Sequence, residues 1–143
     1  LPDLPIFTTA VVVPTTLMHV HVNRVRLKRP PSQSGEIAQA FRSTPRFHLF
    51  AGWERVEGTP QVMEYARGRG EGRSDIMENV LWEDGVRLAG ADAYFFQAIH
   101  QESIVVPENI DAIRAMFDLA PDAATSIART DAALGMTAGK RPG

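Results

Sequence analysis

The sequence predicts an α+β fold, in which helices lie on one side of a mostly antiparallel sheet. Early in the chain, residues 15–28 alternate apolar with polar or charged side chains, which is typical of a strand with one wet face. Between residues 76 and 100, the turn signals Glu-Asp-Gly and Ala-Gly-Ala-Asp divide an apolar region into three short strands. Residues 106–136 instead place apolar residues at helical spacing.

In chain order, the expected elements are strands over 6–13 and 15–28, a helix over 34–44, a strand over 46–50, a helix over 58–70, three strands within 76–100, and helices over 106–119 and 120–136. Pro107 and Pro121 are expected to open the last two helices, because proline fits the first helical turn. Glu108 and Asp111 would then face the positive end of the helix dipole, and Gly135 would cap the final helix.

Composition limits the class of protein. The chain has 143 residues, of which 44% are hydrophobic and 22% charged, enough for one globular domain with a core. The net charge is -2 and the basic residues are scattered, so the sequence does not predict a surface that binds nucleic acid. It shows no apolar stretch of about 20 residues and no signal-like leader, so no membrane partner is expected. The chain contains no cysteine, which excludes disulfides and a cysteine nucleophile carried by these residues.

Two histidines lie close together in the run Pro-Thr-Thr-Leu-Met-His-Val-His. Side chains of a strand repeat on one face every second residue, so His19 and His21 should share a face roughly 7 Å apart. A metal site, which would need further ligands from elsewhere, a catalytic base and a structural role all remain open for this pair.

The other two histidines carry weaker signals. His100 ends an apolar strand and precedes the polar residues Gln101, Glu102 and Ser103, so it starts either a loop or a ligand site. His48 has no polar neighbours in sequence and is predicted to be structural. Serine, histidine and aspartate do not follow one another in an order that predicts a serine hydrolase.

Several longer motifs carry a resemblance to a known family. The segments Pro-Thr-Thr-Leu-Met-His-Val-His-Val-Asn (14–23) and His-Gln-Glu-Ser-Ile-Val-Val-Pro-Glu-Asn-Ile-Asp-Ala-Ile-Arg-Ala-Met (100–116) resemble the catalytic domain of archaeal-type (type II) phosphorylating glyceraldehyde-3-phosphate dehydrogenase. The likeness extends to the motifs at 43–47, 74–80 and 126–136. The likeness covers residues 6–136, and we expect residues 1–136 to form the C-terminal part of that catalytic domain, followed by a frayed tail over 137–143.

The resemblance implies roles for two residues. His19 falls on the family's catalytic base, and Gln101 matches the position that contacts the nicotinamide end of NAD or NADP. The implied substrates are glyceraldehyde 3-phosphate and inorganic phosphate, and the nucleophilic cysteine of the family lies upstream of this segment. His21, His100, Thr15 and Thr16 receive no assigned role, and no metal is implied.

The resemblance also implies a cytoplasmic enzyme that is a homo-oligomer, a tetramer in relatives. The chain is expected to be an incomplete piece of that enzyme and inactive by itself. Two alternatives remain: a non-catalytic remnant that pairs with other subunits, and a metal-binding module built on His19 and His21.

Overall fold

The computed structural model describes residues 18–136 of the chain. The expected strand over 6–13, Thr15, Thr16 and the tail over 137–143 lie outside the described residues. The longer elements are β1 (His19–Arg26), α1 (Ser34–Arg42), β2 (Phe47–Phe50), α2 (Thr59–Gly68), β3 (Asn79–Trp82), β4 (Arg87–Ala89), β5 (Asp92–Ile99), α3 (Gln101–Met116) and α4 (Ala123–Leu134). Short 3₁₀ turns cover Gly52–Glu54, Gly72–Ser74 and Glu83–Gly85.

The five strands form one mixed sheet in the order β1-β5-β3-β2, with β4 also paired to β5. All pairs are antiparallel except β2 with β3, which is parallel. The parallel pair follows from the chain path, because α2 carries the chain back between β2 and β3. The predicted α+β class and the three strands between residues 76 and 100 are confirmed.

Two core clusters lie on opposite faces of this sheet. Val62, Met63 and Ala66 of α2 pack with Val80 and Ala98, on the face that also carries Val20 and Val22 of β1. We call this the valine face. The three α2 residues are the buried positions that helical spacing favours.

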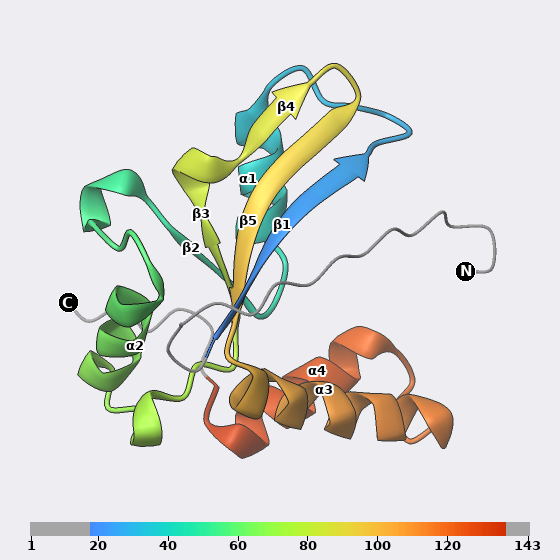
Figure 1. Cartoon of the computed structure of the whole chain (residues 1–143). Helices are drawn as coiled ribbons and strands as arrows, with labels where there is room; N and C mark the ends of the chain where they lie inside the picture. Colours follow the sequence, from blue (N-terminus) through green and yellow to red (C-terminus); the bar gives the residue numbers. More distant parts are fainter. Residues whose placement is uncertain (1–17, 137–143) are drawn as a thin grey trace.

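The other cluster lies on the face that carries His19 and His21, which we call the histidine face. There Ala38 of α1 packs with Leu49 and Leu81, and Phe41, Phe47 and Phe95 surround them. One helix therefore covers each face of the inner strands, so α1 and α2 do not share one side of the sheet. Figure 1 shows α1 and α2 at separate places along the strands, and α3 with α4 together at one end.

The prediction that Pro107 opens a helix is wrong. Helix α3 begins at Gln101, directly after β5, and Pro107 is buried inside it. A proline inside a helix cannot donate to the carbonyl four residues earlier, which here belongs to Ser103. The helix begins earlier because the His100 carbonyl accepts hydrogen bonds from the backbone N–H groups of Ser103 and Ile104, both at 3.1 Å.

Helix α4 matches its prediction more closely, except that Pro121 does not open it and lies just before the cap residue Asp122. Asp122 accepts a hydrogen bond from the Thr125 N–H at 2.7 Å and caps the start, and Gly135 ends the helix with a left-handed φ of 70°. No helix within residues 18–136 has the length and apolar character that crossing a membrane would require.

Candidate functional site

His19 and His21 are the first and third residues of β1, on the histidine face as their spacing predicts. Their ring centroids are 6.4 Å apart, and both side chains are exposed. Strand β1 is the outer strand of the described sheet next to β5, so no described strand covers its far edge. Both imidazoles are therefore accessible to a molecule that approaches this end of the sheet.

Gln101 lies at the same end of the sheet as His19. In the antiparallel pairing of β1 with β5, His19 is opposite Ile99, and Gln101 follows two residues later as the first residue of α3. The Gln101 side chain is exposed. The fold thus places two predicted site residues that are far apart in the sequence at the same end of the sheet. Figure 1 shows β1 beginning where β5 leads into α3.

His100, between these elements, is buried, with 1% of its surface exposed. Its Nδ1 atom lies 2.5 Å from the Ser103 hydroxyl, and its Nε2 atom lies 3.8 Å from Asp75 Oδ1. Sequence reasoning left the role of His100 open and treated Ser103 only as a polar neighbour. Their spacing of three residues was a usable signal, because it places two side chains on one helical turn.

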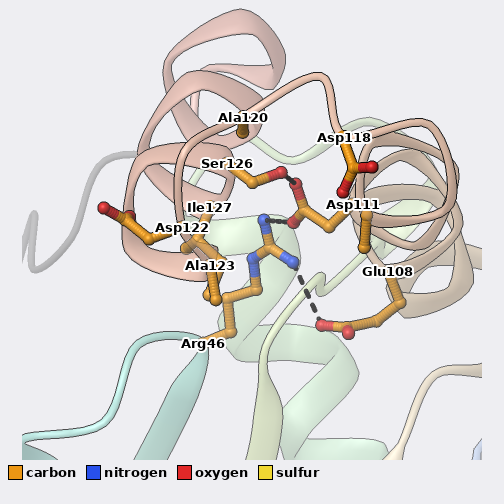
Figure 2. Close-up of a pocket in the computed structure, with 10 residues that line it drawn as sticks. Arg46, Glu108, Asp111, Asp118, Ala120, Asp122, Ala123, Ser126 and Ile127 are labelled. Carbon is orange, nitrogen blue, oxygen red and sulfur yellow. Dashed lines mark hydrogen bonds and ion pairs between the residues drawn. The ribbon is translucent and has the colours of Figure 1, made fainter.

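A second polar cluster surrounds Arg46, where β2 approaches α3 and α4. The guanidinium contacts Asp111 at 2.6 Å, Asp131 at 2.8 Å and Glu108 at 3.1 Å, and its side chain is 4% exposed. Figure 2 shows Arg46 reaching between the two helices toward Asp111 and Glu108. These residues line a pocket of about 320 Å³. The expectation that Glu108 and Asp111 serve the helix dipole is therefore wrong: they lie further along α3 and bind this arginine.

The charges of this cluster stabilise one another. Burial alone would lower the pKa of Arg46, but its close contacts with Asp111, Asp131 and Glu108 outweigh burial and raise that pKa. Burial alone would raise the pKa of Asp111, but hydrogen bonds from Ser126 and Thr130 and the contact with Arg46 lower it. With its three donor nitrogens engaged by carboxylates, Arg46 ties β2 to the α3–α4 pair.

His48 is half-buried and packs its ring against Phe50 and Tyr65, with centroids 4.5 and 4.9 Å away. Burial lowers its pKa, which favours the neutral ring. This packing agrees with the structural role predicted for it. Within residues 18–136, no three or more histidine, aspartate or glutamate side chains are grouped so that they could hold a metal ion.

No protein-family model matches the chain. Among curated proteins, it is 47% identical over 142 residues to glyceraldehyde-3-phosphate dehydrogenase of Hyperthermus butylicus, covering 99% of this chain and 41% of that protein. The proteins of the same name from Metallosphaera sedula and Methanopyrus kandleri are 45% and 43% identical, and cover 97% and 95% of this chain. This chain covers 40% and 39% of their lengths, respectively.

The chain belongs to the archaeal-type glyceraldehyde-3-phosphate dehydrogenase family. The predicted resemblance is thereby confirmed, and the mixed sheet with four helices is consistent with part of this family's catalytic domain. The chain spans about two fifths of the length of the glyceraldehyde-3-phosphate dehydrogenases it matches. The names of these relatives are those of oxidoreductases.

Proposed function

We propose that this chain supplies the general base and part of the nicotinamide site of a phosphorylating glyceraldehyde-3-phosphate dehydrogenase. In this proposal the enzyme oxidises glyceraldehyde 3-phosphate with NAD or NADP and inorganic phosphate to 1,3-bisphosphoglycerate. The observation that supports it most is that the exposed residues His19 and Gln101 lie at the same end of the sheet, in a chain of this family.

His19 would act as the general base that accepts a proton during oxidation. A cysteine thiolate attacks the aldehyde and gives a thiohemiacetal, whose hydroxyl must lose its proton as the hydride departs. The imidazole accepts that proton, and the strand fixes its direction within the tolerance that proton transfer requires. The chain has no cysteine, so the thiolate belongs in this proposal to the part of the family's chain that these 143 residues do not cover.

Gln101 would orient the cofactor. When bound, the nicotinamide ring accepts the hydride. The Gln101 side chain can donate from its amide nitrogen and accept at its amide oxygen, which matches the carboxamide of nicotinamide on both counts. Its exposure at the first turn of α3, at the same end of the sheet as His19, fits this assignment.

The homo-oligomer is also part of the proposal. Val20, Val22 and Phe96 lie together on the valine face, and they are 48%, 75% and 45% exposed. An exposed apolar patch on an outer strand favours contact with another protein surface. In the predicted homo-oligomer, this patch would contact a second copy of the chain. The same patch favours the alternative of a non-catalytic pairing remnant.

A full-length chimera tests the catalytic proposal. Residues 1–143 replace the matching segment of the Hyperthermus butylicus enzyme, which supplies the remaining sequence. We expect His19→Asn to lower kcat by roughly 10²–10⁴, the usual contribution of a general base. His21→Asn, on the same face two residues along, is the matched control and should change kcat by less than about tenfold.

Two results would contradict the proposal: a folded chimera without activity, or a His19→Asn chimera with unchanged kcat. The 143-residue chain by itself should show no turnover, since it lacks a nucleophilic cysteine. Gln101→Ala should raise the KM for the cofactor more than it lowers kcat. That split separates the role of Gln101 from the role of His19.

A further inference from the structure

His100 joins the end of β5 to the start of α3 and is the residue before the first helical position. Its backbone carbonyl accepts hydrogen bonds from the N–H groups of Ser103 and Ile104, so it closes the first turn of the helix. Its side chain is as buried as the apolar core. Because the His100 ring is buried, its orientation is constrained by its neighbours. The contacts of the ring therefore help to fix the conformation of the first turn of α3.

The two ring nitrogens of His100 have different surroundings. Nε2 faces the Asp75 carboxylate at 3.8 Å and forms no hydrogen bond with residues 18–136. A carboxylate on that side favours the tautomer with the ring proton on Nε2. Nδ1 then accepts a hydrogen bond from the Ser103 hydroxyl, which lies 2.5 Å away.

This arrangement has the residue types of a hydrolytic triad but not its chemistry. Ser103 is 2% exposed, so its hydroxyl cannot reach a substrate. The burial of His100 equally keeps its ring from acting as a base on a bound aldehyde. The three side chains instead connect the turn before β3, which carries Asp75, to the first turn of α3.

Gln101 and Glu102 are the exposed residues at the start of this turn. His100 and Ser103 on either side are buried, and Glu102 forms an ion pair with Arg73 at 2.8 Å. We propose that His100 is a positioning residue, which holds the first turn of α3 through Ser103 and Asp75 so that the Gln101 amide meets the nicotinamide carboxamide. The inference rests on the proposed function, because it assigns Gln101 to the cofactor.

The test uses the full-length chimera and the KM for the cofactor. His100→Leu removes both ring contacts, and Ser103→Ala removes one with little change in volume. We expect each to raise this KM about tenfold and to lower kcat by less than about threefold, since a small misplacement of a binding group weakens binding first. His100→Asn keeps an acceptor near the Nδ1 position and should restore most of the lost affinity.

A double-mutant cycle with Gln101→Ala distinguishes positioning from general structural damage. If His100 acts through Gln101, His100→Leu should change the KM by less than about twofold once Gln101 is alanine. Additive effects would overturn the inference. His48→Leu, which removes a half-buried histidine elsewhere, is the matched control and should leave the KM unchanged.

The remaining outcomes separate this inference from the proposed function. Suppose that Gln101→Ala raises the KM for the cofactor, but Ser103→Ala, His100→Asn and His100→Leu all leave this KM unchanged. In that case the inference alone fails. If Gln101→Ala leaves the KM unchanged, the cofactor role of Gln101 fails and the inference fails with it. If His100→Leu does not fold, Ser103→Ala and its cycle with Gln101→Ala decide the matter.

Discussion

Asp92 is the carboxylate on which two arginines of the outer strand converge. Arg26 donates to it from Nε and Nη2 at 3.1 and 3.0 Å, and Arg24 donates from Nη2 at 3.0 Å. These hydrogen bonds, from Arg26 first and then from Arg24, lower the pKa of Asp92 to about 2. The contacts of Arg24 and Arg26 with Asp92 join the C-terminal end of β1 to the start of β5, away from His19 and His21.

The pKa of Asp92 predicts a pH-dependent stability. An aspartate in an unfolded chain has a pKa of about 3.9, so the folded state holds the ionised form more tightly. The stabilisation is complete above that unfolded value and is lost as pH falls through about 2. We expect Asp92→Asn to lower the Tm of the 143-residue chain at pH 7.

The difference in Tm between Asp92→Asn and the unsubstituted chain should shrink below about pH 4 and vanish only as pH falls below about 2. Thermal melts followed by circular dichroism across this range measure it. A difference that is the same at every pH would show that the variant acts by some route other than its charge.

At the scale of elements, α3 and α4 are attached to the sheet through Arg46 as well as through the chain. Ser126 and Thr130 of α4 donate to Asp111 of α3 at 2.5 and 2.7 Å, and Arg46 contacts both helices. These two polar residues, with Ile127 and Leu134 only partly buried, fill the inner side of α4. The helix pair is therefore joined by hydrogen bonds and ion pairs more than by an apolar core.

We expect Arg46→Met to lower the free energy of unfolding of the 143-residue chain by about 3 kcal/mol. Removing one partner of a buried ion pair leaves the others without compensation, and here Asp111 and Asp131 would lose their cation. Urea unfolding measures the change.

Arg67→Met is the matched control, because Arg67 pairs with Glu64 on an exposed helix surface. Its effect should be less than about 0.5 kcal/mol. Equal effects of the two substitutions would mean that burial of the Arg46 cluster contributes nothing.

At the scale of the whole molecule, the two faces of the sheet differ in what they leave exposed. The histidine face exposes His19 and His21 at one end, and the valine face exposes Val20, Val22 and Phe96. Since neighbouring residues of a strand point to opposite faces, a contact on the valine face leaves the imidazoles free. The proposed assembly and the proposed catalysis would therefore use different surfaces of the same strand.

Val22→Glu in the full-length chimera should weaken its self-association and lower its mass in solution. A charge placed in the centre of an apolar contact must lose its water without a partner. Light scattering after size-exclusion chromatography measures the mass. Val106→Glu, at an exposed position of α3, is the control and should leave the mass unchanged. Loss of mass in both variants, or in neither, would argue against the valine face.

Local patterns predicted the elements whose signals are local. The helix expected over 58–70 and the cap at Gly135 depend on residues within one or two turns, and both are confirmed. The start of α3 was not predictable in this way. Pro107 is a strong local signal for a helix start, but the buried ring and carbonyl of His100 begin the helix earlier. Here tertiary burial outweighs a local preference.

By itself, the sequence determined the α+β class, the family and the shared face of His19 and His21, because periodicity and motif are properties of neighbouring residues. Tertiary structure alone decided which distant residues meet. It placed Gln101 at the same end of the sheet as His19, buried His100 between Ser103 and Asp75, and gave Arg46 its three carboxylates. Such contacts depend on strand register and helix packing, which join residues that no local pattern relates.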